Sequence, residues 1–180
     1  MCIRDSLLAI AAGLGADVPF FLLGGCALGV SKGDEIYPLP DGPRFSLLIV
    51  SPREIQVPTA DAYRWLHAPR LASLTKNVAD HKLYRFCALC WSALGVVLSN
   101  DFEAAVFRRH PRLAQIKRAL LQAGASEALL AGSGSAVFGV FPSPAKARRA
   151  AVGFPHDQSF VCESVSRKRY ARVLKTAFVV

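Results

Sequence analysis

The sequence has no uninterrupted apolar run long enough to cross a bilayer. The stretch "LLAIAAGLGADVPFFLLGGC" comes nearest, and its "LGGC" faintly resembles a lipoprotein cleavage site. Asp17 and Pro19 divide this stretch into apolar pieces of about ten residues, which are too short for a membrane helix. We therefore expect a cytoplasmic protein that has no membrane partner, with secretion as the alternative.

Cysteine is too sparse and too irregularly spaced for a disulfide framework. The five cysteines are Cys2, Cys26, Cys87, Cys90 and Cys162, an odd set that favours a reducing compartment. Cys87 and Cys90 form a C-x-x-C, but they lie one turn apart in the helical pattern "DHKLYRFCALCWSALGVVL", and no two further zinc ligands occur at suitable spacing. We predict buried thiols and no metal-ligating residues.

Acidic residues are few, and the charge is uneven. There are 13 Asp and Glu against 22 Lys and Arg, a net charge of +9. Residues 1–100 hold 9 basic and 8 acidic residues, whereas residues 101–180 hold 13 and 5. Such an excess fits a nucleic acid, an acidic membrane surface or a phosphorylated small molecule, and it also fits a solvated basic surface.

What is present suggests an α+β fold of ordinary domain size with a large core, since 52% of the 180 residues are hydrophobic. The elements come in mixed order without an internal repeat. Helices are predicted over 7–13 (capped by Ser6), 59–68, after Asp80, near 100, over 111–124, from 144 and over 167–174. Strands are predicted twice within 24–40, around a turn at 31–34, and over 44–52, 127–132, 136–141 and 159–166.

Asp17 is the only charged residue between Ser6 and Lys32. A carboxylate isolated from water costs several kcal/mol unless it is paired. Held in apolar surroundings beside Pro19, it could accept or orient the proton of a substrate hydroxyl as a general base. The alternative is a loop aspartate that accepts hydrogen bonds from backbone N–H groups.

The segment "LLAGSGSAVFGVF" offers a loop that could hold an anion. Gly132 and Gly134 would let backbone N–H groups approach a phosphate closely. An ordinary hairpin turn between two strands is the alternative, and the chain contains neither G-x-x-x-x-G-K-[ST] nor G-x-G-x-x-G before a helix.

The helix "TADAYRWL" places Thr59 and Tyr63 one turn apart, so both can face one cleft with the tyrosine ring available to stack on a planar base. In the alternative interpretation, Tyr63, Trp65 and Leu66 are core residues of an amphipathic helix.

In chain order, "LGADVPFFLLGGCALGVSKGDEIYPLP", "VPTADAY", "NDFE" with a later "HP", and "GASEALLAGSGSAVFGVF" resemble the 4-diphosphocytidyl-2-C-methyl-D-erythritol kinases, a family of the GHMP kinase superfamily in the non-mevalonate isoprenoid pathway. The likeness runs from about residue 7 over nearly the whole chain. It implies a GHMP kinase C-terminal domain over 44–180, with helices packed on an antiparallel sheet. Residues 7–43 would be a remnant of the N-terminal kinase domain, and residues 1–6 an unrelated leader.

The resemblance also implies roles for single residues. Asp17 would be catalytic. Thr59 and Tyr63 would bind the substrate, and the Tyr63 ring would stack on its cytosine. The phosphate loop would consist of Gly132, Ser133, Gly134 and Ser135. The implied reaction transfers the γ-phosphoryl group of ATP, with Mg²⁺, to the 2-hydroxyl of 4-diphosphocytidyl-2-C-methyl-D-erythritol. The partner would be this small molecule, and the chain a monomer or weak homodimer.

The chain departs from the family at its front. The family's catalytic lysine and its longer glycine- and serine-rich ATP loop find no match in this sequence, nor do the early histidine and tyrosine of the substrate pocket. We therefore expect an N-terminally truncated kinase that is inactive alone. The alternatives are a GHMP kinase for homoserine or mevalonate, and a non-catalytic basic module that binds nucleic acid, although no zinc knuckle, RRM-type motif or helix-turn-helix pattern supports the latter.

Overall fold

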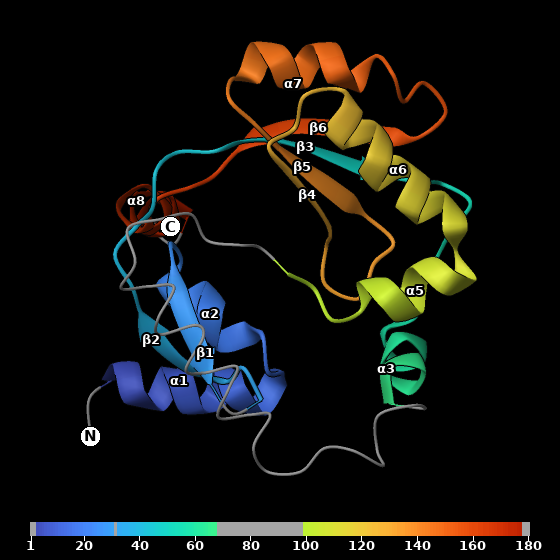
Figure 1. Cartoon of the computed structure of the whole chain (residues 1–180). Coiled ribbons are helices and arrows are strands. Elements are labelled where there is room, and N and C mark those ends of the chain that lie inside the picture. The colour runs from blue at the N-terminus through green and yellow to red at the C-terminus, as the bar shows by residue number, and fades with distance from the viewer. Residues whose placement is uncertain (1–2, 31, 68–98, 178–180) are drawn as a thin grey trace. The chain divides into compact units, whose positions relative to one another are not determined.

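The computed structural model describes residues 3–30, 32–67 and 99–177, which form two compact units (Figure 1). Unit 1 comprises residues 1–44 and 163–180, and unit 2 comprises residues 45–162. The helix predicted after Asp80 and the C-x-x-C motif lie outside the described residues. The assignment of residues 7–43 and 44–180 to two kinase domains stays a prediction.

Unit 1 contains a pair of helices, a hairpin and the last helix of the chain. Its elements are α1 (Ile3–Leu14), α2 (Val18–Leu23), β1 (Ala27–Val30), β2 (Glu35–Pro38) and α8 (Arg167–Ala177). The predicted hairpin is confirmed, because β1 and β2 pair antiparallel around Gly33, whose φ of +91° suits a glycine turn. The predicted start of the first helix is wrong, since α1 begins at Ile3 and Ser6 lies inside it.

Helix α8 is fastened to the rest of unit 1 through Arg167. Its guanidinium donates hydrogen bonds to the carbonyl oxygens of Gly24 at 3.3 Å and Leu39 at 3.0 Å, and also to that of Cys26. The Asp41 carboxylate accepts hydrogen bonds from the Arg167 N–H at 2.8 Å and the Cys26 N–H at 3.2 Å. One arginine therefore ties the end of α2 and both ends of the hairpin to the start of α8.

A second contact joins α8 to α2. The Tyr170 hydroxyl donates to the Phe21 carbonyl oxygen at 2.7 Å. Gly24, which ends α2 with a φ of +61°, lies so close to this ring that a Cβ there would stand 2.2 Å from Tyr170 Cδ1. The close approach and the positive φ both require glycine at this position.

Unit 2 is built on a four-stranded sheet in the order β4-β5-β3-β6. The strands are β3 (Ser46–Ser51), β4 (Glu127–Leu130), β5 (Val137–Phe141) and β6 (Gln158–Glu163), and the helices are α3 (Thr59–His67), α5 (Glu103–Arg109), α6 (Pro111–Gln122) and α7 (Pro144–Ala151). Strand β5 pairs antiparallel with both β3 and β4. The predicted α+β class, with helices on an antiparallel sheet, is confirmed.

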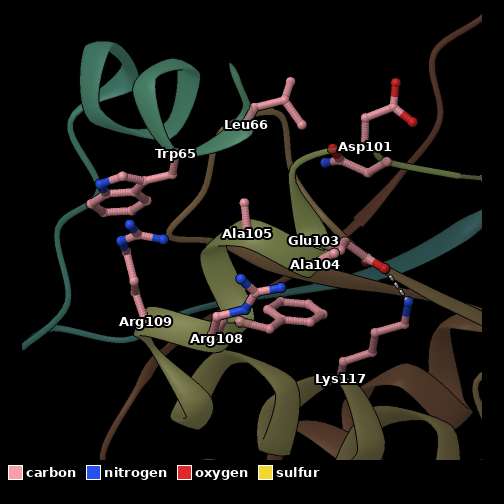
Figure 2. Close-up of a pocket in the computed structure, with 11 residues that line it drawn as sticks. Trp65, Leu66, Asp101, Glu103, Ala104, Ala105, Arg108, Arg109 and Lys117 are labelled. Atoms are coloured by element: carbon pink, nitrogen blue, oxygen red, sulfur yellow. Dashed lines mark hydrogen bonds and ion pairs between the residues drawn. The ribbon is translucent and has the colours of Figure 1, made fainter. Parts of the chain in front are cut away.

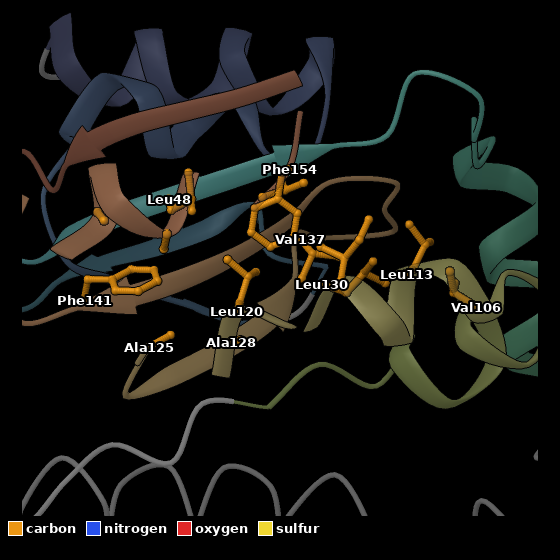
Figure 3. Packing of buried hydrophobic residues seen from close by; sticks show 14 of the residues in the cluster. Leu48, Val106, Leu113, Leu120, Ala125, Ala128, Leu130, Val137, Phe141 and Phe154 are labelled. Atoms are coloured by element: carbon orange, nitrogen blue, oxygen red, sulfur yellow. The ribbon is translucent and has the colours of Figure 1, made fainter. Parts of the chain in front are cut away.

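The core of unit 2 lies between the sheet and two helices (Figure 3). Helix α6 packs on β4 and β5, and α7 packs on β3 and β5. Alternate residues of β3 and β5 are buried, as expected of strands covered on one face. On α6, Leu113, Ile116 and Leu120 are buried as their spacing predicts, whereas Leu121 is 41% exposed, because the buried stripe is narrower than the apolar pattern.

Within the described ranges, none of the helices is long and apolar enough to cross a membrane.

Candidate functional site

The glycine-rich segment forms the loop that joins β4 to β5. The last ladder pair is Leu130 with Val137, and the Gly134 N–H donates to the Ala131 carbonyl oxygen at 2.9 Å. The backbone of this segment thus forms the expected hairpin turn. The hairpin does not exclude anion binding, because in the described part of the chain the N–H groups of three loop residues donate no hydrogen bond, namely Gly132, Ser133 and Ser135.

Two glycines give this loop its shape. Gly132 has a φ of +57° and Gly134 a φ of +97°, both in the region that side chains disfavour. Within the described part of the chain, a Cβ on Gly132 would meet no atom within 4 Å, which leaves space for a ligand to approach the backbone. The loop therefore combines uncommitted N–H donors with an accessible main chain, which are the properties of a phosphate-binding loop.

Thr59 connects this loop to helix α3. As the first residue of α3, it lies with its Oγ1 3.2 Å from the Oγ of Ser133, although the two residues are 74 positions apart in sequence. The resemblance gives Thr59 a role in substrate binding and Ser133 a role in phosphate binding. The two residues are therefore in contact within unit 2.

Tyr63 lies one turn further along α3 and is 50% exposed. Its ring meets Phe102 edge to face, with the ring centroids 5.0 Å apart. Trp65 packs against the core, as its amphipathic position predicts. The core interpretation therefore fits Trp65 and does not fit Tyr63, which keeps half of its surface in contact with solvent.

Two residues of "NDFE", to which the sequence assigns no role, contact the backbone of the glycine loop and of β4. Asn100 Nδ2 donates to the carbonyl oxygens of Leu130 at 2.8 Å and Gly132 at 2.7 Å. Glu103 Oε1 accepts the Leu130 N–H at 2.9 Å. Both side chains hold the β4 end of the glycine loop, and two polar residues around the start of helix α5 are the signal that could have revealed them.

A pocket of about 630 Å³ opens next to the glycine loop and is lined in part by Asn100 and Glu103 (Figure 2). Figure 2 shows Lys117 pointing toward Glu103, to which it is joined by an ion pair at 2.6 Å. Across the pocket, the Arg109 guanidinium lies 4.6 Å from the centre of the Trp65 ring. None of the predicted site residues lines this pocket, so it lies beside the glycine loop without including it.

Asp17 stands in unit 1 at the N-cap of α2, immediately before Val18 and Pro19. Its side chain is exposed and makes no capping hydrogen bond. The expectation that apolar sequence neighbours would shield it is therefore wrong within this unit. The reason is that some of those neighbours face outward, such as Leu14, which is 75% exposed. The backbone-satisfied alternative does not hold for this carboxylate either.

The chain is similar to known kinases in sequence and in structure. Residues 83–156 match the family model described as GHMP kinases C terminal. The 4-diphosphocytidyl-2-C-methyl-D-erythritol kinase of Solibacter usitatus is 46% identical over 165 residues, which are 91% of this chain and 52% of that protein. A crystal structure of 4-(cytidine 5'-diphospho)-2C-methyl-D-erythritol kinase is 29% identical, with a TM-score of 0.66, over 87% of this chain and 56% of the other.

The chain has the fold of a GHMP kinase C-terminal domain. Its likeness to the crystal structure of a homoserine kinase from Cytophaga hutchinsonii, at 22% identity and a TM-score of 0.63, over 92% of this chain and 58% of the other, shows the GHMP kinase fold alone. The chain spans about half the length of the curated relatives it matches, 52% of the first and 46% of another from Solidesulfovibrio magneticus.

Proposed function

We propose that this chain supplies the substrate and phosphate sites of a 4-diphosphocytidyl-2-C-methyl-D-erythritol kinase. The whole protein would transfer the γ-phosphoryl group of ATP to the 2-hydroxyl of 4-diphosphocytidyl-2-C-methyl-D-erythritol, in the non-mevalonate isoprenoid pathway. Because the chain spans about half the length of its relatives, we expect the 180 residues alone to transfer no phosphate at a useful rate.

The observation that carries the proposal is the contact between Thr59 and Ser133. A kinase needs one ligand-binding surface that continues from the acceptor molecule to the phosphate, because phosphoryl transfer depends mainly on positioning and charge stabilisation. Thr59 stands between the half-exposed ring of Tyr63 and the loop with uncommitted N–H groups. This order, ring then hydroxyl then glycine loop, suits a base, a diphosphate linker and a transferred phosphate.

Each group would do one task in the reaction. Tyr63 would stack on the cytosine, far from the reacting atoms, and so fix the acceptor in place. The N–H groups of Gly132, Ser133 and Ser135 would stabilise the charge on the phosphate oxygens. The exposed carboxylate of Asp17 would accept or orient the proton of the 2-hydroxyl.

ATP fits the glycine loop by the chemistry of its donors, since a phosphate needs hydrogen-bond donors and an approachable backbone. Mg²⁺ has no comparable site here: among the described residues no three His, Cys, Asp or Glu side chains gather closely enough to hold a metal ion. We therefore derive no step through the metal.

The test uses the chain as it exists and asks where a cytidine nucleotide binds. Backbone NMR signals are followed while cytidine diphosphate is added, and adenosine diphosphate serves as the comparison. We expect cytidine diphosphate to shift the signals of Tyr63, Thr59 and Ser133. Shifts confined to the pocket beside them, at Ala104 and Ala105, or no shifts at all, would contradict the assigned cytidyl site.

A further inference from the structure

Two side chains of unit 2 hold the glycine loop from outside it. The structure assigns Asn100 and Glu103 as positioning residues that fix the geometry of the loop for phosphate binding. This inference rests on the proposed function, because the ligand of the loop is the phosphate proposed there. Neither side chain is expected to touch the phosphate itself.

Asn100 uses its whole amide for this task. Its Nδ2 donates to the carbonyl oxygens of Leu130 and Gly132, on either side of the point where β4 ends, while its Oδ1 accepts the Phe102 N–H at 2.9 Å. A single planar group thereby ties the start of α5 to two carbonyl groups that enter the loop. The second of them belongs to the glycine with the positive φ of +57°.

Glu103 fixes Leu130, the last residue of β4 before the loop. Oε1 accepts the Leu130 N–H, and Oε2 pairs with Lys117 of α6 at 2.6 Å. The side chains of Glu103 and Lys117 are 18% and 26% exposed, so water competes little for this pair. The ammonium group holds the carboxylate in one orientation, which favours the hydrogen bond that Glu103 accepts from the Leu130 N–H.

Together these contacts explain how the loop can keep N–H groups free. A six-residue connection whose own backbone contributes few hydrogen bonds would adopt many conformations, and each would present its donors differently. Asn100 and Glu103 restrict the entrance through the carbonyl and N–H of Leu130 and the carbonyl of Gly132. The donors further along then remain available in one arrangement, as a preorganised anion site requires.

The test compares the wild-type 180-residue chain with three variants. Asn100→Asp keeps the size and the acceptor of the side chain but removes the two donated hydrogen bonds. Glu103→Gln keeps an acceptor and removes the charge that pairs with Lys117. Asp157→Asn is the matched control, because it breaks the other ion pair of α6, Arg112 to Asp157 at 2.9 Å, without touching the loop.

Two readouts are taken, namely the backbone amide signals of Gly132, Ser133 and Ser135, and the dissociation constant for pyrophosphate. We expect Asn100→Asp to shift the loop signals and to weaken pyrophosphate binding about tenfold, and Glu103→Gln to have a smaller effect in the same direction. We expect Asp157→Asn to lower the melting temperature while leaving both loop readouts unchanged.

The outcomes separate this inference from the proposed function. Loop signals that stay in place in Asn100→Asp and Glu103→Gln would overturn the positioning role, whatever the melting temperatures do. If the loop signals move but the wild-type chain binds no pyrophosphate, the two residues do set the loop's geometry, and it is the phosphate role of the loop that fails. If Asn100→Asp does not fold, the loop signals of Glu103→Gln alone decide between the two outcomes.

Discussion

Tyr63 shows at the scale of one residue how a functional side chain differs from its neighbours. It stands in the amphipathic helix α3 next to Ala62, which is fully buried, and two positions before Trp65, which packs on the core. Half of its own surface stays exposed even though its ring also meets Phe102 edge to face. An aromatic ring that stays half-exposed offers a surface on which a base can stack.

We predict that Tyr63→Ala weakens binding of cytidine diphosphate about tenfold or more, because base stacking is worth roughly 1–3 kcal/mol. Tyr63→Phe should be nearly neutral, since a stack needs the ring and not the hydroxyl. Titration calorimetry of the three chains measures this. Tyr37→Ala is the control, because Tyr37 is equally exposed, at 49%, but belongs to unit 1. A Phe variant as weak as the Ala variant would show that the hydroxyl, and not stacking, matters.

At the scale of secondary-structure elements, α8 is held to unit 1 by polar contacts of its first turn. Arg167 reaches three carbonyl groups that lie 128 to 143 residues earlier in the chain. Basic residues near a chain end are ordinarily solvated, and the sequence of residues 167–174 predicts only a helix. In this fold, the charged side chain of Arg167 donates hydrogen bonds to backbone carbonyl groups.

We predict that Arg167→Ala lowers the free energy of unfolding by about 2–4 kcal/mol, because three carbonyl groups, those of Gly24 and Leu39 in part-buried contacts, lose a charged donor. Arg169→Ala, two positions along the same helix at an exposed site, should change it by about 0.5 kcal/mol or less. Urea titration followed by circular dichroism compares the two. Equal effects of the two substitutions would show that Arg167 is only a surface charge.

The same scale shows what sequence patterns can and cannot predict here. The hairpin of β1 and β2, the buried strand β3 and the helix that begins at Pro111 were predictable, because turn residues and apolar periodicity are local signals. The exposure of Asp17 was not, because burial depends on which apolar neighbours face inward. The contacts of Asn100 and Glu103 with the glycine loop and β4 were not predictable either, because they join residues some 30 positions apart through single hydrogen bonds.

For the molecule as a whole, part of the basic excess of residues 101–180 has an internal use. Arg112 pairs with Asp157, Lys117 with Glu103, and Arg167 with backbone carbonyl groups. These three cations therefore have partners within the fold. The remaining positive charge fits an anionic small molecule, such as a nucleoside diphosphate, and it also fits a solvated basic surface.

The most direct test of the proposed reaction joins this chain to the part of the Solibacter usitatus relative that it does not span. ATP-dependent phosphorylation of 4-diphosphocytidyl-2-C-methyl-D-erythritol is then followed by phosphorus NMR, with homoserine and mevalonate as competing acceptors. The 180-residue chain alone is the second comparison.

We predict that the joined protein phosphorylates the cytidyl substrate and neither competitor, and that the chain alone is inactive. Asp17→Asn in the joined protein should lower turnover about 10²- to 10⁴-fold, the usual cost of losing a general base. The melting temperature should stay unchanged, since the Asp17 carboxylate makes no capping hydrogen bond. Unchanged turnover in Asp17→Asn, or transfer to homoserine or mevalonate in place of the cytidyl substrate, would contradict the account.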